Sequence, residues 1–122
     1  DFINYGKENV IVVRVDATQY EGWFYEGAGI YRHVWLNKYN NVHIGNDGTF
    51  VYSNVVNNKA SLNLEIPIEN QNFNSSNCTI NSIITDRVGK VVGQTNEQSV
   101  LLNANETKII KQKISVISPK LW

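Results

Sequence analysis

Strict alternation of apolar and polar residues in one stretch, ASLNLEIPI (residues 60–68), most limits what this chain can fold into. Its apolar face is formed by Ala60, Leu62, Leu64, Ile66 and Ile68. Successive side chains of a strand point to opposite faces, and no helical register fits as well, so the pattern predicts a strand with one buried face. Burial of the four larger side chains would contribute on the order of 6–12 kcal/mol before the entropy cost of ordering the strand. Pro67 has no backbone N–H, so we expect that position to face solvent or a bulge.

The same alternation recurs along most of the remaining chain, separated by turn signals. One further run places four residues on a shared face, namely Cys78, Ile80, Ser82 and Ile84. Asp86 and Gly89 predict a tight hairpin, and a polar turn at 103–107 precedes a long strand that carries Ile110, Ile114 and Val116. An Asn-Asp-Gly turn at 46–48 separates two short strands. From about residue 34 onward we count roughly seven short strands, which predicts an all-β, immunoglobulin-like antiparallel β-sandwich.

Composition excludes several classes of function. The formal net charge is zero, which argues against a nucleic-acid-binding face and a polybasic membrane patch, because both need a local excess of Lys and Arg. The lysines of 108–120 alternate with apolar residues and are interpreted as the solvated face of a strand. No apolar run approaches the ~18 residues of a membrane span, and no signal peptide is expected. The single cysteine, Cys78, allows no internal disulfide and is predicted to be a small core residue.

The first 33 residues have a different character. ENVIVVRVDA (residues 8–17) predicts a strand with Ile11, Val13 and Val15 facing inward, and an aromatic loop follows it. One strand and a loop cannot make a domain. We therefore expect residues 1–33 to be the end of a preceding β-domain and residues 34–122 to be a complete second domain. The absence of methionine and the ending PKLW also favour a piece of a longer protein.

Four motifs occur in order along the chain: NVIVVRVD, WFYEGAGIYRHVWL, VHIGNDGTFVY and a terminal SPKLW. Together they resemble family 2 glycoside hydrolases of the β-galactosidase type. In that family a sugar-binding jelly-roll domain ends in a strand and an aromatic crossing, and an immunoglobulin-like sandwich follows. The catalytic (β/α)8 barrel comes after the sandwich. The resemblance spans nearly the whole chain and is specific at its two ends.

The resemblance implies that the aromatic crossing lies between two domains. Gly27 and Gly29 permit positive φ angles and close backbone approach there. The residues expected to fill this domain seam are Trp23, Tyr25, Ile30, Arg32 and Trp35. The guanidinium of Arg32 suits a carboxylate in such a seam, although an ordinary surface pair with Glu26 is the alternative.

The resemblance also implies that Asp16 reaches substrate hydroxyl groups in the whole enzyme, since a carboxylate can accept hydrogen bonds from two vicinal hydroxyls. The alternative is that Asp16 caps the following turn. The family usually has an Arg just before the tryptophan, whereas Gly22 stands here, which leaves the local geometry of the loop open.

No residue of this chain is predicted to be catalytic. The resemblance places both carboxylates of the retaining mechanism in the barrel, outside this chain. His33 and His43 stand ten residues apart without a ligand-like Cys or acidic neighbour, so we expect no metal site and no cofactor.

These observations predict a non-catalytic scaffold segment of a β-galactosidase-like glycoside hydrolase. Its partners would be the jelly-roll domain and barrel of the parent enzyme, and carbohydrate would be met through that parent. A periplasmic or secreted bacterial location is expected from the enzyme type. The rival hypothesis is a self-standing carbohydrate-binding or adhesion-type β-sandwich, in which Trp23, Tyr25 and Trp35 would form an exposed sugar-stacking platform.

Overall fold

A computed structural model of the chain describes residues 3–16 and 29–121. The chain divides into two compact units, Asp1–Leu36 and Asn37–Trp122. All eight strands of the described residues belong to the second unit: β1 (Val42–Ile44), β2 (Phe50–Val56), β3 (Lys59–Asn70), β4 (Ser76–Ile80), β5 (Ile83–Thr85), β6 (Val91–Gln94), β7 (Gln98–Leu102) and β8 (Thr107–Ile117). No helix that is long and apolar enough to cross a membrane occurs in the described residues.

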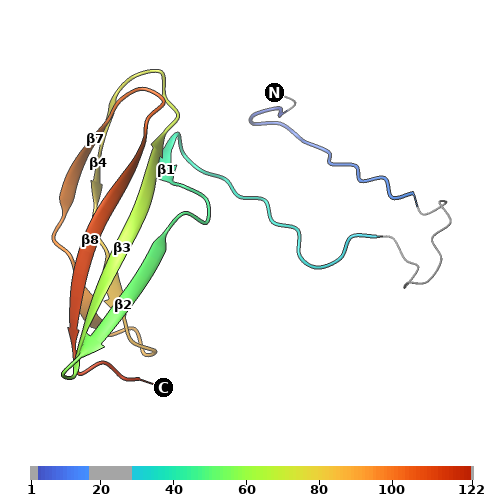
Figure 1. The fold of residues 1–122 in the computed structure, drawn as a ribbon. Coiled ribbons are helices and arrows are strands. Elements are labelled where there is room, and N and C mark those ends of the chain that lie inside the picture. Colours follow the sequence, from blue (N-terminus) through green and yellow to red (C-terminus); the bar gives the residue numbers. More distant parts are fainter. Residues whose placement is uncertain (1–2, 17–28, 122) are drawn as a thin grey trace. The chain divides into compact units, whose positions relative to one another are not determined.

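A four-stranded antiparallel sheet forms one layer of the second unit. The long strand β3 lies at its centre and pairs with β8 along one edge, from Lys59↔Ile117 to Glu69↔Thr107. Along its other edge β3 pairs first with β2 and then with β1 (Figure 1). We call this layer sheet A.

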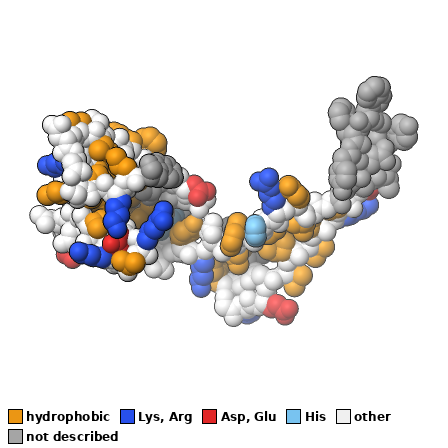
Figure 2. All heavy atoms as spheres, turned by 90° about the horizontal axis from the view of Figure 1, so that it is seen from below, with side chains coloured by type: hydrophobic (Ala, Val, Ile, Leu, Met, Phe, Trp, Pro, Cys, Tyr) orange, Lys and Arg blue, Asp and Glu red, His pale blue; other side chains and the backbone are white. Residues whose placement is uncertain are grey.

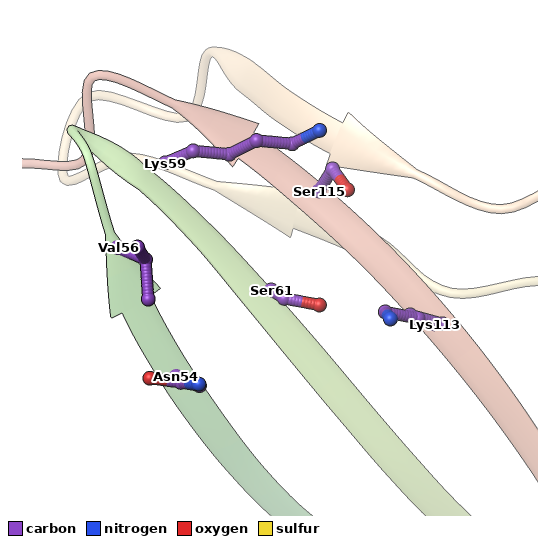
Figure 3. Close-up of a pocket in the computed structure, with 6 residues that line it drawn as sticks. All are labelled: Asn54, Val56, Lys59, Ser61, Lys113 and Ser115. Atoms are coloured by element: carbon purple, nitrogen blue, oxygen red, sulfur yellow. The ribbon is translucent and has the colours of Figure 1, made fainter.

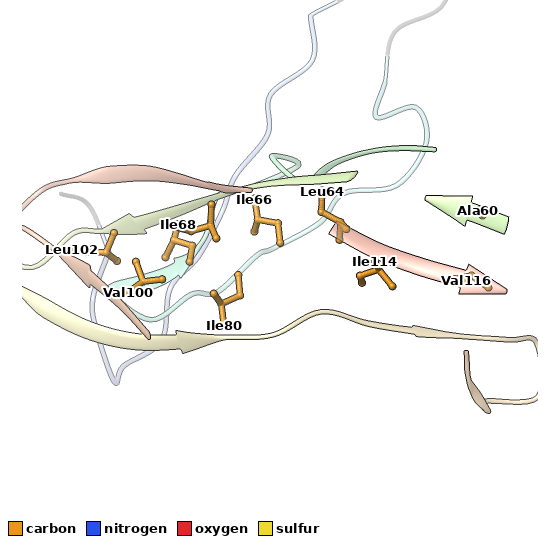
Figure 4. Close-up of a cluster of buried hydrophobic side chains, with 10 residues drawn as sticks. Ala60, Leu64, Ile66, Ile68, Ile80, Val100, Leu102, Ile114 and Val116 are labelled. Atoms are coloured by element: carbon orange, nitrogen blue, oxygen red, sulfur yellow. The ribbon is translucent and has the colours of Figure 1, made fainter. Parts of the chain in front are cut away.

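The second layer consists of two short antiparallel pairs, β4 with β7 and β5 with β6. The hydrophobic core lies between the layers, as Figure 4 shows. Its residues are Ala60, Leu64, Ile66 and Ile68 from β3, Ile80 from β4, Val100 and Leu102 from β7, and Ile110, Ile114 and Val116 from β8. The predicted all-β antiparallel sandwich is therefore confirmed.

Within the sandwich, the period-two pattern correctly predicted which residues point inward. Every apolar residue of the inward face of β3 is buried except Leu62, which is half-buried against the core. Cys78 and Ile84 are also half-buried and pack against the core. The lysines of β8 are exposed, as expected for a solvated face.

Pro67 lies where β3 passes from its pairing with β1 to its pairing with β2. The Pro67 carbonyl accepts a hydrogen bond from the Gly45 N–H at 2.9 Å. Because the N and O atoms of one strand residue point the same way, the missing N–H faces the loop between β1 and β2. The proline thus costs no ladder hydrogen bond, in agreement with the expectation that it faces a bulge or solvent.

The predicted strand at residues 8–17 is wrong for its described part. No residue of 3–16 belongs to a strand, and Ile11, Val13 and Val15 are 80%, 58% and 48% exposed. A strand needs a hydrogen-bonded neighbour, and the described residues of the first unit supply no second strand. Apolar side chains consequently stand exposed in the described residues of the first unit, where Figure 2 colours hydrophobic side chains orange.

Candidate functional site

Asp16, the residue predicted to face substrate, lies in the extended part of the first unit. Its Oδ2 atom accepts a hydrogen bond from Arg14 Nη2 at 3.2 Å, and the two side chains are 50% and 87% exposed. An ion pair that is this exposed is weak, because water and salt screen it. The role of Asp16 toward substrate stays a prediction.

Three of the predicted seam residues are described, whereas Trp23 and Tyr25 lie outside the described residues. Ile30 and Trp35 are 63% and 78% exposed. Trp35 stacks on His33 with ring centroids 5.4 Å apart, and the Arg32 guanidinium lies 5.2 Å from the centre of the Tyr31 ring. Each of these contacts joins residues one or two positions apart in the chain.

The backbone of this segment differs from the glycine-based expectation. At Gly29 the φ angle is not positive, so the left-handed backbone permitted by glycine is not used there. An added Cβ would meet no atom of this chain within 4 Å, and a close approach to a second domain stays a prediction. Arg32 instead has a φ of 71°, which is uncommon for a residue other than glycine. Gly27 and Glu26 lie outside the described residues.

A polar cluster surrounds His43 where β1 joins β3. The imidazole stacks on Tyr39 at 4.8 Å, and its Nε2 lies 3.6 Å from Glu69 Oε2. The Tyr39 hydroxyl donates a hydrogen bond to Asn46 Oδ1 at 2.7 Å. These contacts attach the segment before β1 to the sandwich. His43 is a strand residue, as predicted, and the described residues contain no group of three or more His, Cys, Asp or Glu that could hold a metal ion.

Two adjoining hollows lie on the outer face of sheet A, on the side away from the core. The larger, of ≈ 270 Å³, is lined by Asn54, Val56, Lys59, Ser61, Lys113 and Ser115 (Figure 3). The smaller, of ≈ 180 Å³, is lined by Tyr52, Asn63, Leu64, Glu65, Lys111, Gln112 and Lys113. We call these two sets of residues the outer-face site. Sequence reasoning missed the site, because it forms only when three strands pair in one register.

The outer-face site lacks the groups needed to hydrolyse a glycoside. That reaction uses two carboxyl groups on either side of the scissile bond. Glu65 is the only carboxylate lining the two hollows, and its Oε1 lies 2.9 Å from Lys111 Nζ. The hydrogen bond and charge of Glu65 raise the pKa of Lys111 above its ordinary value. The site can therefore bind polar groups but has no acid and nucleophile pair.

The sandwich has a sequence match that decides the family. The profile of the family described as glycosyl hydrolases family 2 matches residues 42–122, from the start of β1 to the end of the chain. The chain belongs to glycosyl hydrolases family 2. The resemblance seen in the four sequence motifs is thereby confirmed.

Two curated family 2 relatives align with almost the whole chain. The β-galactosidase BoGH2A of Bacteroides ovatus is 36% identical over 99% of the chain, and a β-glucuronidase of Formosa agariphila is 26% identical over 98%. The chain spans 14% of the length of each of these two enzymes.

Solved family 2 structures also resemble the chain. A family 2 member from Bacteroides cellulosilyticus superposes with a TM-score of 0.62 over 68% of this chain and 11% of that chain, at 26% identity. A family 2 β-glucuronidase gives a TM-score of 0.57 over 62% of this chain and 8% of that chain, at 26% identity. The chain thus corresponds to a small part of much larger enzymes.

Proposed function

We propose that this chain is a non-catalytic scaffold segment of a family 2 glycoside hydrolase. The observation that carries the proposal is that a family match covers the sandwich while the chain spans only 14% of relatives that cleave β-glycosides. The outer-face site has a single carboxylate, which is paired with Lys111, so this site does not offer the two carboxyl groups that glycoside hydrolysis uses. In the whole enzyme the segment would brace the catalytic domain.

We further propose that residues 1–33 end a sugar-binding domain and that residues 34–122 form the immunoglobulin-like domain. The division between the two compact units falls after Leu36, close to this boundary. In this arrangement Trp23, Tyr25, Ile30, Arg32 and Trp35 fill the seam between domains. Exposure of Ile30 and Trp35 in the chain alone accords with side chains that need a partner surface.

Two further parts of the proposal concern the whole enzyme. Asp16 would contact substrate hydroxyls, and the enzyme would be periplasmic or secreted.

The test compares three samples on nitrophenyl β-galactoside, β-glucuronide and β-mannoside. The samples are the longer enzyme that contains this sequence, the same enzyme without residues 37–122, and the 122-residue chain alone. We expect turnover by the first sample only. Turnover by the chain alone, or full turnover by the enzyme that lacks the sandwich, would contradict the scaffold role.

A self-standing binding module is the second candidate, and the 78% exposure of Trp35 is the observation that favours it. In that case Trp23, Tyr25 and Trp35 would stack on sugar rings. Binding of neutral oligosaccharides by the chain, lost on Trp35→Ala, together with an inert longer protein, would support this candidate over the scaffold.

A further inference from the structure

The outer face of sheet A is organised in rows that cross three strands. The register places Asn54 beside Ser61 and Ser61 beside Ser115. One step along, a second row contains Tyr52, Asn63 and Lys113, and a third contains Phe50, Glu65 and Lys111. On the other side of the first row lies a row of Val56, Lys59 and Ile117. Rows on the same face are about 7 Å apart, because successive outward residues are two positions apart.

Small side chains in the first row create the larger hollow. Asn54, Ser61 and Ser115 are short, whereas the rows on either side contribute the long side chains of Lys59 and Lys113. Figure 3 shows the two lysines on either side of the short row. The smaller hollow continues from Lys113 toward Tyr52, so one trough runs along the outer face.

The trough has an excess of positive charge. Lys111 is paired with Glu65. Neither Lys59 nor Lys113 has a carboxylate within ion-pair distance among the residues that the structure describes, and both side chains are exposed. Two ammonium groups at one hollow favour an anionic ligand, but they are too few for a nucleic-acid backbone, which is bound by many more cations.

The hydroxyl group of Ser61 is the second observation that points to a ligand. Its Oγ atom is buried and has no hydrogen-bond partner within the described part of the chain. A buried hydroxyl without a partner is costly, and a ligand hydroxyl would supply one once a small movement of the side chains that line the hollow uncovers the Oγ atom. Ser115, Asn54 and Asn63 offer further donors and acceptors along the trough.

Tyr52 completes the chemistry of the trough. It is 48% exposed and lies against Phe50, with ring centroids 5.5 Å apart. A partly exposed aromatic ring beside hydroxyl and amide groups presents an apolar surface next to polar contacts, which matches the two kinds of surface on a sugar ring.

We propose that the outer-face site binds an acidic saccharide, a polyhydroxylated ring that bears a carboxylate or sulfate group. Lys59 and Lys113 pair with the acidic group, Ser61 and its neighbours bind hydroxyls, and Tyr52 contacts the ring. The site lies on the sandwich and does not require the proposed scaffold role or any glycosidase activity. Its occupant would be bound without being cleaved.

The experiment measures binding of the 122-residue chain to oligogalacturonate by calorimetry at low salt. Methyl-esterified oligogalacturonate has the same sugar backbone without the charge, and polyglutamate has the charge without the sugar. A sulfated oligosaccharide and its unsulfated form show whether sulfate can replace the carboxylate. We expect the acidic saccharides to bind, the neutral forms and polyglutamate to bind at least about tenfold more weakly, and salt to weaken binding.

Variants locate the site and separate binding from folding. The double variant Lys59→Gln/Lys113→Gln should weaken binding about tenfold or more, whereas the double variant Lys38→Gln/Lys90→Gln, which removes the same two charges outside the site, should leave it within twofold. Ser61→Ala should weaken binding while leaving the melting temperature unchanged or higher, because it removes a buried unpaired hydroxyl. Absence of binding, equal binding of the methyl ester or polyglutamate, or an equal loss in Lys38→Gln/Lys90→Gln would overturn the proposal.

Discussion

At the residue scale, Asn70 is the buried polar residue with the most hydrogen bonds. It ends β3 with 1% of its surface exposed. Its Nδ2 donates to the Asn74 carbonyl at 2.9 Å and to the Asn103 carbonyl at 2.7 Å. Its Oδ1 accepts from both the backbone and the side chain of Asn72 at 3.0 Å. One amide group therefore holds together the loop after β3 and the loop after β7.

Asn70→Asp tests how much this network contributes to stability. The change keeps the shape but replaces two donors with acceptors that face carbonyl oxygens. We expect the free energy of unfolding to fall by about 2–4 kcal/mol, because two carbonyls lose their partners and a charge is buried. Urea unfolding measures the change.

Asn77→Asp is the control, because it makes the same chemical change on the exposed face of β4. Its free energy of unfolding should stay within about 0.5 kcal/mol of that of the unchanged chain. Similar values for the two variants would show that the network adds little.

The sequence could not single out Asn70 or the outer-face site. The chain is rich in asparagine, and nothing local distinguishes the one that is buried. Its main partners, the carbonyls of 74 and 103, lie in two loops that only the folded sandwich brings together. The row of Asn54, Ser61 and Ser115 likewise depends on the register of three strands, two of which are separated by most of the domain.

At the element scale, two turns use glycine for different reasons. In the loop between β1 and β2, an added Cβ on Gly48 would lie 2.4 Å from Pro67 Cγ, so the glycine makes room for the proline. In the hairpin between β5 and β6, Gly89 has a φ of 84° and an added Cβ would meet nothing within 4 Å. The second glycine is therefore required by its backbone conformation alone.

Matched substitutions should separate these two causes. Asn tolerates positive φ angles, so Gly89→Asn should cost less than Gly89→Ala, which we expect to destabilise by about 1 kcal/mol. At Gly48 the order should reverse. Ala should cost about 1–3 kcal/mol through the clash with Pro67, and the larger Asn should cost at least as much. Thermal unfolding of the four variants measures these costs. If Ala and Asn ranked in the same order of cost at Gly48 and Gly89, the two glycines would not be required for different reasons.

Local signals explain which elements could be predicted. Alternation and turn residues identified β3, β8 and the hairpin at Asp86–Gly89, where Asp86 Oδ1 accepts hydrogen bonds from the N–H groups of Val88 and Lys90. The same alternation misled at residues 8–17, because it reports the tendency of a segment to pair and not the presence of a neighbour. The division of 78–84 into β4 and β5 also depends on partners far along the chain.

At the scale of the whole molecule, the hydrophobic core belongs to one unit. All buried apolar residues of the described chain lie between Ala60 and Val116, inside the Asn37–Trp122 unit. In the first unit, the apolar side chains from Ile3 to Val15 and from Ile30 to Leu36 are between 48% and 89% exposed. Exposed apolar groups contribute little to the free energy of folding, since folding removes little of their surface from water.

We therefore predict that residues 37–122 fold as stably as the 122-residue chain. The free energy of unfolding in urea should agree within about 0.5 kcal/mol. The denaturant slope should also be unchanged, because it scales with the surface that unfolding exposes and the first unit exposes its described apolar side chains already.

The hydrogen bonds of Tyr39 to Asn46 and of Asn41 to Asn72 involve only residues after position 36, so the shortened chain keeps them. A second shortened chain, 45–122, removes β1 and these bonds and should be clearly less stable. If residues 37–122 lost more than about 1 kcal/mol or showed a smaller slope, residues 1–36 would have to share buried surface with the sandwich.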